Sequence, residues 1–445
     1  MQQNGHRAGD SPPARSLASL RSSAFEWSRA AALSPWLWVV LGALIAAPFP
    51  MFGWPLPERA APIFFLLVAG ILWSLGRISA ASWPFALLIL WAGVRAGYQD
   101  FPIRAQGLLV LLLMGGFLYA LAREMPDRIA RAVVWALLVS VGWEVLLGAF
   151  NAFGVYPFMK WVSAEHIGKP MGFLTHPNYW GSLVALALPL VWSRVGWIGV
   201  AVCWLLLLKT VSGGPVISAA VGSVVMAWPL FGRRVRLAVA GIGAAGIALT
   251  MTLHEWRLSG RSEVWSKSLD ELLKPAADGF SAKWAVIGQG LGGWRIWADG
   301  WNAAYHRPEQ GKTFFITLQA HNEPLQLWFE LGVVGLAIAG LWALQAFCAC
   351  RSIWRAAPNA LIPSPWYGWG RAPLERAWPA VLAVAAVNML GSPVFHLPGQ
   401  AAIIVFALAR AQADAAALTE PIPVTARAPK RQRAQKETVN VASAR

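Results

Sequence analysis

Twelve apolar runs, each 14 to 27 residues long, dominate this sequence of 445 residues. A helix that crosses a membrane needs about 17–25 mostly apolar residues, because the hydrocarbon core of a bilayer is about 30 Å thick. Polar backbone groups in that core must bond within their own segment, which favours helices. The runs therefore predict an all-α, polytopic membrane protein with about twelve transmembrane helices. They lie at 35–53, 61–76, 80–97, 105–121, 129–151, 180–193, 196–210, 215–231, 235–253, 322–348, 377–396 and 399–412.

The composition is that of a chain surrounded by lipid. Hydrophobic residues make up 57% of the chain and charged residues 13%, which is about half the charged share of a soluble domain. The 27 tryptophans fit the same class, because indole rings concentrate where a bilayer meets water. The net charge of +16 comes from basic residues in the gaps between apolar runs. This distribution argues against a nucleic-acid partner and indicates that the charges set membrane topology.

The gaps also predict the orientation of the chain. Cytoplasmic segments carry an excess of Lys and Arg, and with both termini in the cytoplasm these segments hold 23 of the 37 basic residues. In a bacterial inner membrane, residues 1–34 are then a disordered cytoplasmic tail and 35–253 contain nine transmembrane helices. Residues 254–320 form a large periplasmic loop, 321–412 contain three further transmembrane helices, and 413–445 are a disordered, basic cytoplasmic tail.

The periplasmic loop is predicted to carry short helices. Four apolar residues recur in it at helical spacing: Trp265, Leu269, Leu272 and Leu273. They predict an amphipathic helix over 260–273, suited to lying on the bilayer surface. Residues 288–294 are rich in glycine and predict a turn. They lack the preceding strand and following helix of a dinucleotide site.

Polar residues on the predicted outer side form the candidate site. Arg261 begins the amphipathic helix, and His321 and Asn322 mark the place where the loop re-enters the membrane. Glu330 lies in an apolar run, where an ionisable side chain is costly and usually functional. The remaining candidates lie at outer helix ends: Lys209, Ser212, His176 and Asn178.

Each candidate also has a purely structural interpretation. Arg261 can contact phosphate headgroups, His321 and Asn322 can cap a helix, and Glu330 can bond a neighbouring helix. Glu144, in the run at 129–151, is assigned a structural rather than a catalytic role. The sequence contains no Asp-x-Asp, His-Glu-x-x-His or Cys-x-x-Cys motif and no phosphate-binding loop. It therefore predicts neither a metal site nor a cofactor.

Three sequence blocks agree in order and spacing with one family. They are GFLTHPNYWGSLVALALPL at 172–190, SGRSEVW at 259–265 with the glycines of 288–293, and AHNEPLQLWFELGVVGL at 320–336. With the large outer loop and the number of predicted helices, they resemble the O-antigen ligase and polymerase family of bacterial membrane glycosyltransferases.

The resemblance implies a metal-independent glycosyltransferase of lipopolysaccharide or other surface-polysaccharide biosynthesis. Its donor is an undecaprenyl-diphosphate-linked glycan, used at the periplasmic face. The acceptor is the lipid A core for a ligase, a second lipid-linked glycan for a polymerase, or a pilin hydroxyl for some relatives. Arg261 is expected to stabilise the leaving diphosphate, and His321 to take the proton of the acceptor hydroxyl. Six residues are expected to bind substrate: His176, Asn178, Lys209, Ser212, Asn322 and Glu330.

One difference from the family concerns its second diphosphate contact. Members commonly carry Ser-Arg-Gly where this chain has Ser212-Gly213-Gly214. Either Lys209, one helical turn earlier, replaces that arginine as a point charge, or the donor binds differently.

Two other function classes stay open. A transporter or flippase of a glycolipid or small anion predicts discontinuous helices and a site in the middle of the membrane. A passive subunit of a polysaccharide assembly machine would tolerate replacement of every polar residue named above.

Overall fold

The structure is a computed structural model. It describes residues 83–96, 102–157, 162, 166–174, 176–228, 231–239, 241, 261–274, 283–294, 297–298, 320–356 and 374–419. Within these residues all regular structure is helical, as the apolar runs predict. Three of the described helices are long and apolar enough to cross a membrane, namely Asp127–Ala152, Glu323–Arg355 and Gly399–Leu418.

Nine predicted transmembrane segments coincide with described helices. These helices are α4 (Trp83–Ala96), α5 (Pro102–Glu124), α6 (Asp127–Ala152), α7 (Pro177–Arg194), α8 (Trp197–Lys209), α9 (Gly213–Ala227), α14 (Glu323–Ala356), α15 (Leu374–Asn388) and α16 (Pro398–Thr419). The segments predicted at 35–53 and 61–76 lie outside the described residues, and 235–253 is described only in part.

Three predicted boundaries are wrong. The run at 322–348 was expected to end at 348, but α14 continues to Ala356. The run at 377–396 was expected to be one helix, but α15 ends at Asn388 and a turn follows, with a short 3-10 helix, η7 (Val394–His396). Small and polar residues, including Ser392 and Pro393, end the helix there. Residues 413–419, which were expected to be disordered, are helical, since α16 continues through an alanine-rich stretch to Thr419. Alanine has the highest helix propensity.

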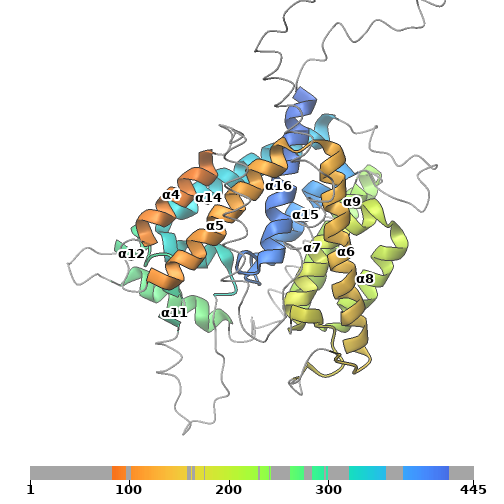
Figure 1. Cartoon of the computed structure of the whole chain (residues 1–445), viewed down its shortest axis with the longest axis horizontal. Coiled ribbons are helices and arrows are strands. Elements are labelled where there is room, and N and C mark those ends of the chain that lie inside the picture. Colours follow the sequence, from red (N-terminus) through yellow and green to blue (C-terminus); the bar gives the residue numbers. More distant parts are fainter. Residues whose placement is uncertain are drawn as a thin grey trace, which may run out of the picture.

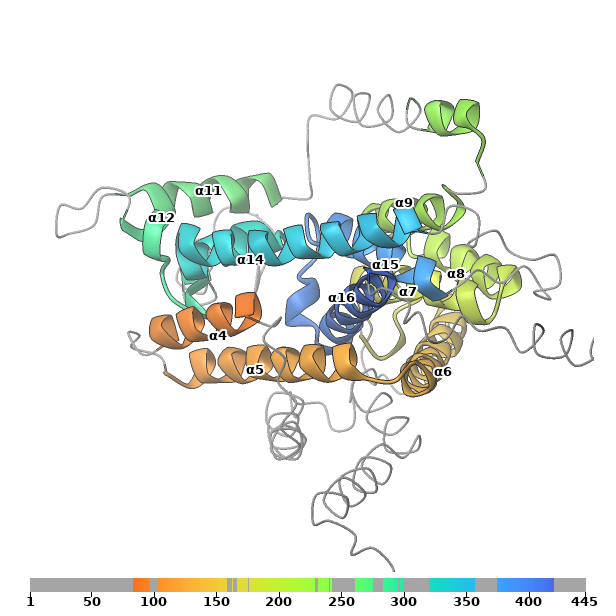
Figure 2. The same ribbon diagram turned by 90° about the horizontal axis from the view of Figure 1, so that it is seen from above.

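Helix α7 occupies the centre of the bundle. Every residue from Trp180 to Val191 is buried, and α6, α8, α9, α15 and α16 pack around it. A helix that is apolar all round is suited to such burial. In both views α6–α9 lie on one side of the molecule and α4, α11 and α12 on the other, with α15 and α16 between them (Figures 1 and 2).

Helix α14 contains a break at Gly332, whose φ of 69° and ψ of −173° are accessible essentially only to glycine. A break leaves carbonyls without their helical partners, and other segments supply donors. Phe329 O accepts from Gln289 N (2.7 Å), and Glu330 O accepts from Gly290 N (2.8 Å). Leu331 O accepts from Trp91 Nε1 of α4 (2.7 Å). The glycine-rich turn predicted at 288–294 is therefore docked on the break.

The predicted amphipathic helix is confirmed as α11 (Arg261–Leu273), with a second short helix, α12 (Lys283–Ile287). Its expected place on the bilayer surface needs correction. Val264 and Leu272 are buried in a cluster with Phe329 of α14, and Trp265 and Leu269 pack against that cluster. Protein therefore covers most of the apolar face, because the first turns of α14 offer a matching apolar surface. Leu273 stays exposed.

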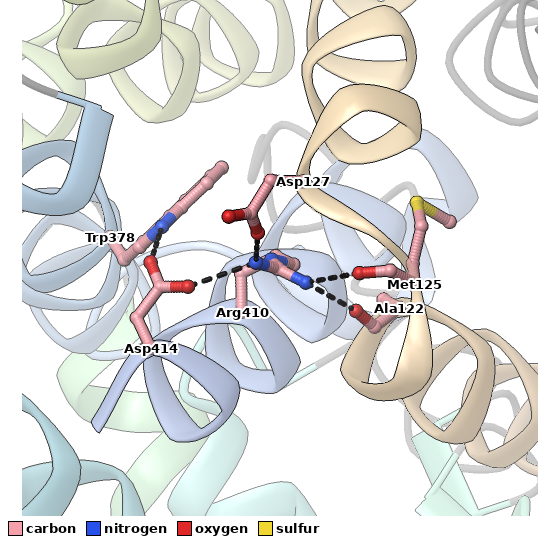
Figure 3. A network of polar contacts seen from close by, with 6 residues as sticks. All are labelled: Ala122, Met125, Asp127, Trp378, Arg410 and Asp414. Atoms are coloured by element: carbon pink, nitrogen blue, oxygen red, sulfur yellow. Dashed lines mark hydrogen bonds and ion pairs between the residues drawn. The ribbon is translucent and has the colours of Figure 1, made fainter. Parts of the chain in front are cut away.

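An ion-pair network around the buried guanidinium of Arg410 joins α5, α6, α15 and α16 (Figure 3). Its partner Asp127 is exposed. Arg410 Nη2 bonds Asp127 Oδ1 (2.5 Å) and Asp414 Oδ1 (2.9 Å), and its Nη1 donates to Met125 O (2.7 Å). Trp378 Nε1 donates to the other oxygen of Asp414 (2.9 Å). Arg410 is only 4% exposed, so these partners compensate for the loss of its hydration.

We predict that Gly332→Ala destabilises the protein. The backbone conformation alone costs about 1–3 kcal/mol for a residue other than glycine, and the new Cβ would overlap Val286 O and lie 2.6 Å from Gly288 N. The test is thermal unfolding in detergent. Gly340→Ala in the same helix is the control, since no atom lies within 4 Å of its Cβ position. Equal unfolding temperatures for the two variants would contradict the prediction.

Candidate functional site

Six polar side chains gather where α7, α9 and α15 meet. We call them the Asn388 cluster: Asn178, Ser182, Ser212, Ser218, Asn388 and Ser392. Asn388 Oδ1 accepts from Ser218 Oγ (2.9 Å) and Ser182 Oγ (3.5 Å). Ser392 Oγ accepts from Ser182 Oγ and from Asn178 Nδ2, both at 3.3 Å. The hydroxyl of Ser212 donates to Asn178 Oδ1 (2.9 Å).

The cluster brings two predicted site residues together. Asn178 and Ser212 are 34 positions apart in the sequence, and they meet because α7 and α9 pack side by side. Asn178 is buried, whereas Ser212 is half-buried. Ser212 therefore lies between the buried hydroxyls and the end of the bundle, which we call the Asn388 end.

Glu323 connects this end to the start of α14. Its backbone N donates to Met389 O, and its Oε1 accepts from Phe395 N, both at 2.8 Å. The turn at 389–397 thus bonds α14 on one side and, through Ser392, α7 on the other. As a result, the sequence blocks at 172–190 and 320–336 lie at one end of the molecule.

His321 and Asn322 form the entry to α14. Asn322 Oδ1 accepts from Leu325 N (3.0 Å), so the predicted helix-capping role of Asn322 is present. His321 is half-buried and has a φ of 53°. Such a backbone conformation is uncommon outside glycine, although histidine adopts it more readily than most residues, and it is enriched at functional sites.

The turn before Ser212 has the same feature. Among the described residues, His321 and Val211 are the two non-glycine residues with positive φ, and the φ of Val211 is 56°. A β-branched residue rarely adopts this conformation. Lys209 ends α8 just before this turn, with an exposed side chain. Both strained residues therefore lie next to residues that the sequence assigns to the site.

Helix α11 brings the remaining sequence block, 259–265, next to the entry of α14. Trp265 Nε1 donates to the carbonyl of Ala320 (2.8 Å), the residue before His321. Arg261 is the first residue of α11, one helical turn before Trp265 and so about 6 Å along the axis. The side chain of Arg261 lies outside the described residues.

His176 caps α7, with its Nδ1 accepting from Asn178 N (3.1 Å). Glu144 of α6 holds the segment just before this cap, because its Oε2 accepts from Phe173 N (3.0 Å). Asn151 Oδ1 accepts from Gly172 N (2.9 Å) in the same segment, which includes the 3-10 helix η3 (Gly172–Leu174). These contacts agree with the structural role expected of Glu144.

Glu330 is buried, with 5% exposure. Its Oε1 accepts from Gln326 Nε2 (3.1 Å), and Gln326 Oε1 accepts from Ala320 N (3.1 Å). The carboxylate is thus linked through Gln326 to the residue before His321. This arrangement favours positioning of His321 over direct contact with a substrate.

Several residues of this end were not identified from the sequence. Ser182, Ser218, Asn388 and Ser392 lie in or beside apolar runs, and each alone resembles an ordinary small or capping residue. The available signal is a polar amide in an apolar helix, which is costly and tends to be retained for a reason. Asn388 fits that description.

No protein-family model matches this chain, and no curated protein sequence matches it either. Within the described residues, no three His, Cys, Asp or Glu side chains are grouped so that they could hold a metal ion.

We predict that Asn388→Leu lowers stability by about 1–3 kcal/mol, because it removes the buried amide that bonds Ser182 of α7 and Ser218 of α9 and puts an apolar side chain among polar ones. Thermal unfolding in detergent measures the effect. Ser352→Ala is the control, since that exposed hydroxyl bonds only the carbonyl of Cys348 in its own helix and its loss should change stability by less than about 0.5 kcal/mol. If Asn388→Leu unfolds no earlier than Ser352→Ala, the cluster does not hold the three helices together.

Proposed function

We propose that this protein is an inner-membrane glycosyltransferase that transfers or polymerises an undecaprenyl-diphosphate-linked glycan. The observation that carries the proposal is the convergence of three sequence blocks at the Asn388 end. His321, the Asn178–Ser212 pair and the first turns of α11 are linked there through hydrogen bonds of their immediate neighbours.

The chemistry requires a proton acceptor and a group that stabilises a leaving diphosphate. As the acceptor hydroxyl attacks the anomeric carbon, the carbon–oxygen bond to the diphosphate breaks and His321 takes the hydroxyl proton. Negative charge grows on the leaving oxygens, where the guanidinium of Arg261 stabilises it through paired donors. The products are the extended glycan and undecaprenyl diphosphate.

The proposal also includes the orientation of the chain in the membrane. About twelve transmembrane helices, with both termini in the cytoplasm, put the Asn388 end at the periplasmic face. The bonded groups support this arrangement, since residues predicted on the outer side, such as Ser212 and Asn178, bond one another. Residues predicted on the inner side, such as Asp127 and Arg410, do the same.

The break in α14 bears on the alternative of a transporter. Discontinuous helices in transporters place their binding sites near the middle of the bilayer. Residues 333–355 alone make a helix about 35 Å long, enough to cross the hydrocarbon core. The break therefore fits one boundary of the membrane better than its middle, which favours the glycosyltransferase.

We predict that His321→Ala slows glycan transfer about 10²–10⁴-fold, because it removes the general base. Arg261→Ala slows transfer about 10²-fold or more through loss of charge stabilisation. Transfer from an undecaprenyl-diphosphate donor is measured with purified protein, and the surface polysaccharide of cells is compared on a gel.

Lys274→Ala is the matched control for Arg261. Lys274 follows the other end of α11, is exposed and pairs with Glu271 at the surface, so transfer stays unchanged. An unaltered polysaccharide ladder in both the His321 and the Arg261 variants disproves the enzymatic role. Movement of the lipid-linked glycan across proteoliposomes without transfer would assign the protein to the transporters.

A second prediction concerns Lys209. If Lys209 supplies the missing donor contact, Lys209→Ala weakens transfer and Gly213→Arg restores it in the same chain. Gly213 is exposed and its Cβ position has no atom within 4 Å, so a side chain can begin there without a clash. The test compares the rate of glycan transfer of Lys209→Ala with that of the double variant Lys209→Ala, Gly213→Arg. Unchanged transfer in Lys209→Ala shows that the donor binds without this lysine.

A further inference from the structure

Arg376, near the start of α15, carries a buried positive charge. The residue is 2% exposed, and among the described residues its Nε and Nη2 have no hydrogen-bond partner. Burying a charge without a partner is costly, so such groups are normally paired. Arg410, at the same end of the bundle, shows the usual solution, with two carboxylates and backbone carbonyls around its guanidinium.

The acidic residues nearby do not provide this pairing. Asp414 bonds Arg410 and Trp378, and Glu375 is exposed on the adjacent position of α15. No salt bridge to Arg376 occurs in the part of the chain that the structure describes. The guanidinium of Arg376 therefore has no counter-ion among the described residues.

The register of the helices places further arginines at the level of Arg376. Asn388 of α15 bonds Ser182 of α7, and these helices run antiparallel. Arg376 lies twelve residues before Asn388 on α15, and Arg194 lies twelve residues after Ser182 on α7. Each is therefore about 18 Å along its helix from that contact. Both therefore lie at the end of the bundle opposite the Asn388 cluster.

Helix α9 ends at the same level. Its Ser218 also bonds Asn388, and Trp228 lies ten residues further along. Arg236 folds back to this point, with its Nε donating to Trp228 O (3.2 Å) and its guanidinium 5.7 Å from the centre of the Trp228 ring. Three arginines from separate elements thus lie at about the same level of the bundle, at the end opposite the Asn388 cluster.

The surroundings indicate an amphipathic ligand. Trp192, Trp197 and Trp228 lie near this level and are at least partly exposed, as expected where a bilayer meets water. The adjoining face of α8 is apolar and exposed, with Leu205 69% and Trp197 59% exposed. A free phosphate needs only the cations, whereas the acyl chains of a lipid also cover such an apolar face.

We propose that Arg376, Arg194 and Arg236 bind the phosphate of an anionic phospholipid at this end of the bundle. The guanidinium groups hold the phosphate oxygens through paired donors, and the acyl chains lie along α8. This site is independent of glycan transfer, because it lies about 18 Å along α15 from the Asn388 cluster.

The test compares phosphatidylglycerol with phosphatidylcholine on the full chain, by native mass spectrometry and by thermal unfolding in detergent. The wild-type protein retains phosphatidylglycerol preferentially and is stabilised by it. Arg376→Leu loses this retention about ten-fold or more, as expected for loss of a charge-assisted hydrogen bond. Arg376→Lys keeps part of the preference, since it keeps the charge but not the planar fork.

Arg351→Gln is the matched control, an exposed arginine in the last turns of α14, and it retains the lipid as the wild type does. In lipid-free detergent Arg376→Leu unfolds at the wild-type temperature or above, because no buried charge is left uncompensated. A lower unfolding temperature there, or equal retention of the two lipids by the wild type, overturns the proposal. Equal stabilisation by inorganic phosphate alone also overturns it, by assigning the site to a free anion.

Discussion

A polar group removed from water is costly unless it is hydrogen-bonded, and this constraint organises most of the described structure. Membrane helices satisfy their own backbone, so polar side chains and broken turns become the points at which helices are joined. Asn388 joins α15 to α7 and α9, and Arg410 joins α16 to α5 and α6. The open carbonyls beside Gly332 fix the glycine-rich turn and α4 against α14.

The sequence predicted the helices well, because apolar length is a local property. The run at 129–151 became α6 with nearly the same ends, and the spacing of Trp265 and Leu269 located α11. The surface that covers each helix is not a local property, because it depends on segments far away in the sequence. The apolar side of α11 was assigned to the bilayer, but Phe329 and Leu325 cover it. Only the fold shows that α14 offers a matching surface.

The candidate site also has features that could be predicted from the sequence and features that could not. Asn322 and His176 were recognised as possible caps because capping follows from a few neighbouring residues. The bonds of Glu323 to the turn at 389–397 could not be predicted, since they connect segments about 70 positions apart. The strained backbones of Val211 and His321 likewise depend on surrounding structure that holds each turn in place.

The burial of α7 has a consequence for biogenesis. A helix enclosed by protein from Trp180 to Val191 depends on α9, α15 and α16, which the ribosome makes later. Until α15 and α16 are synthesised, about 200 codons downstream, α7 lacks several of the helices that finally enclose it. A chain truncated before α15 would lack this enclosure and become a target for the proteases that remove incompletely folded proteins.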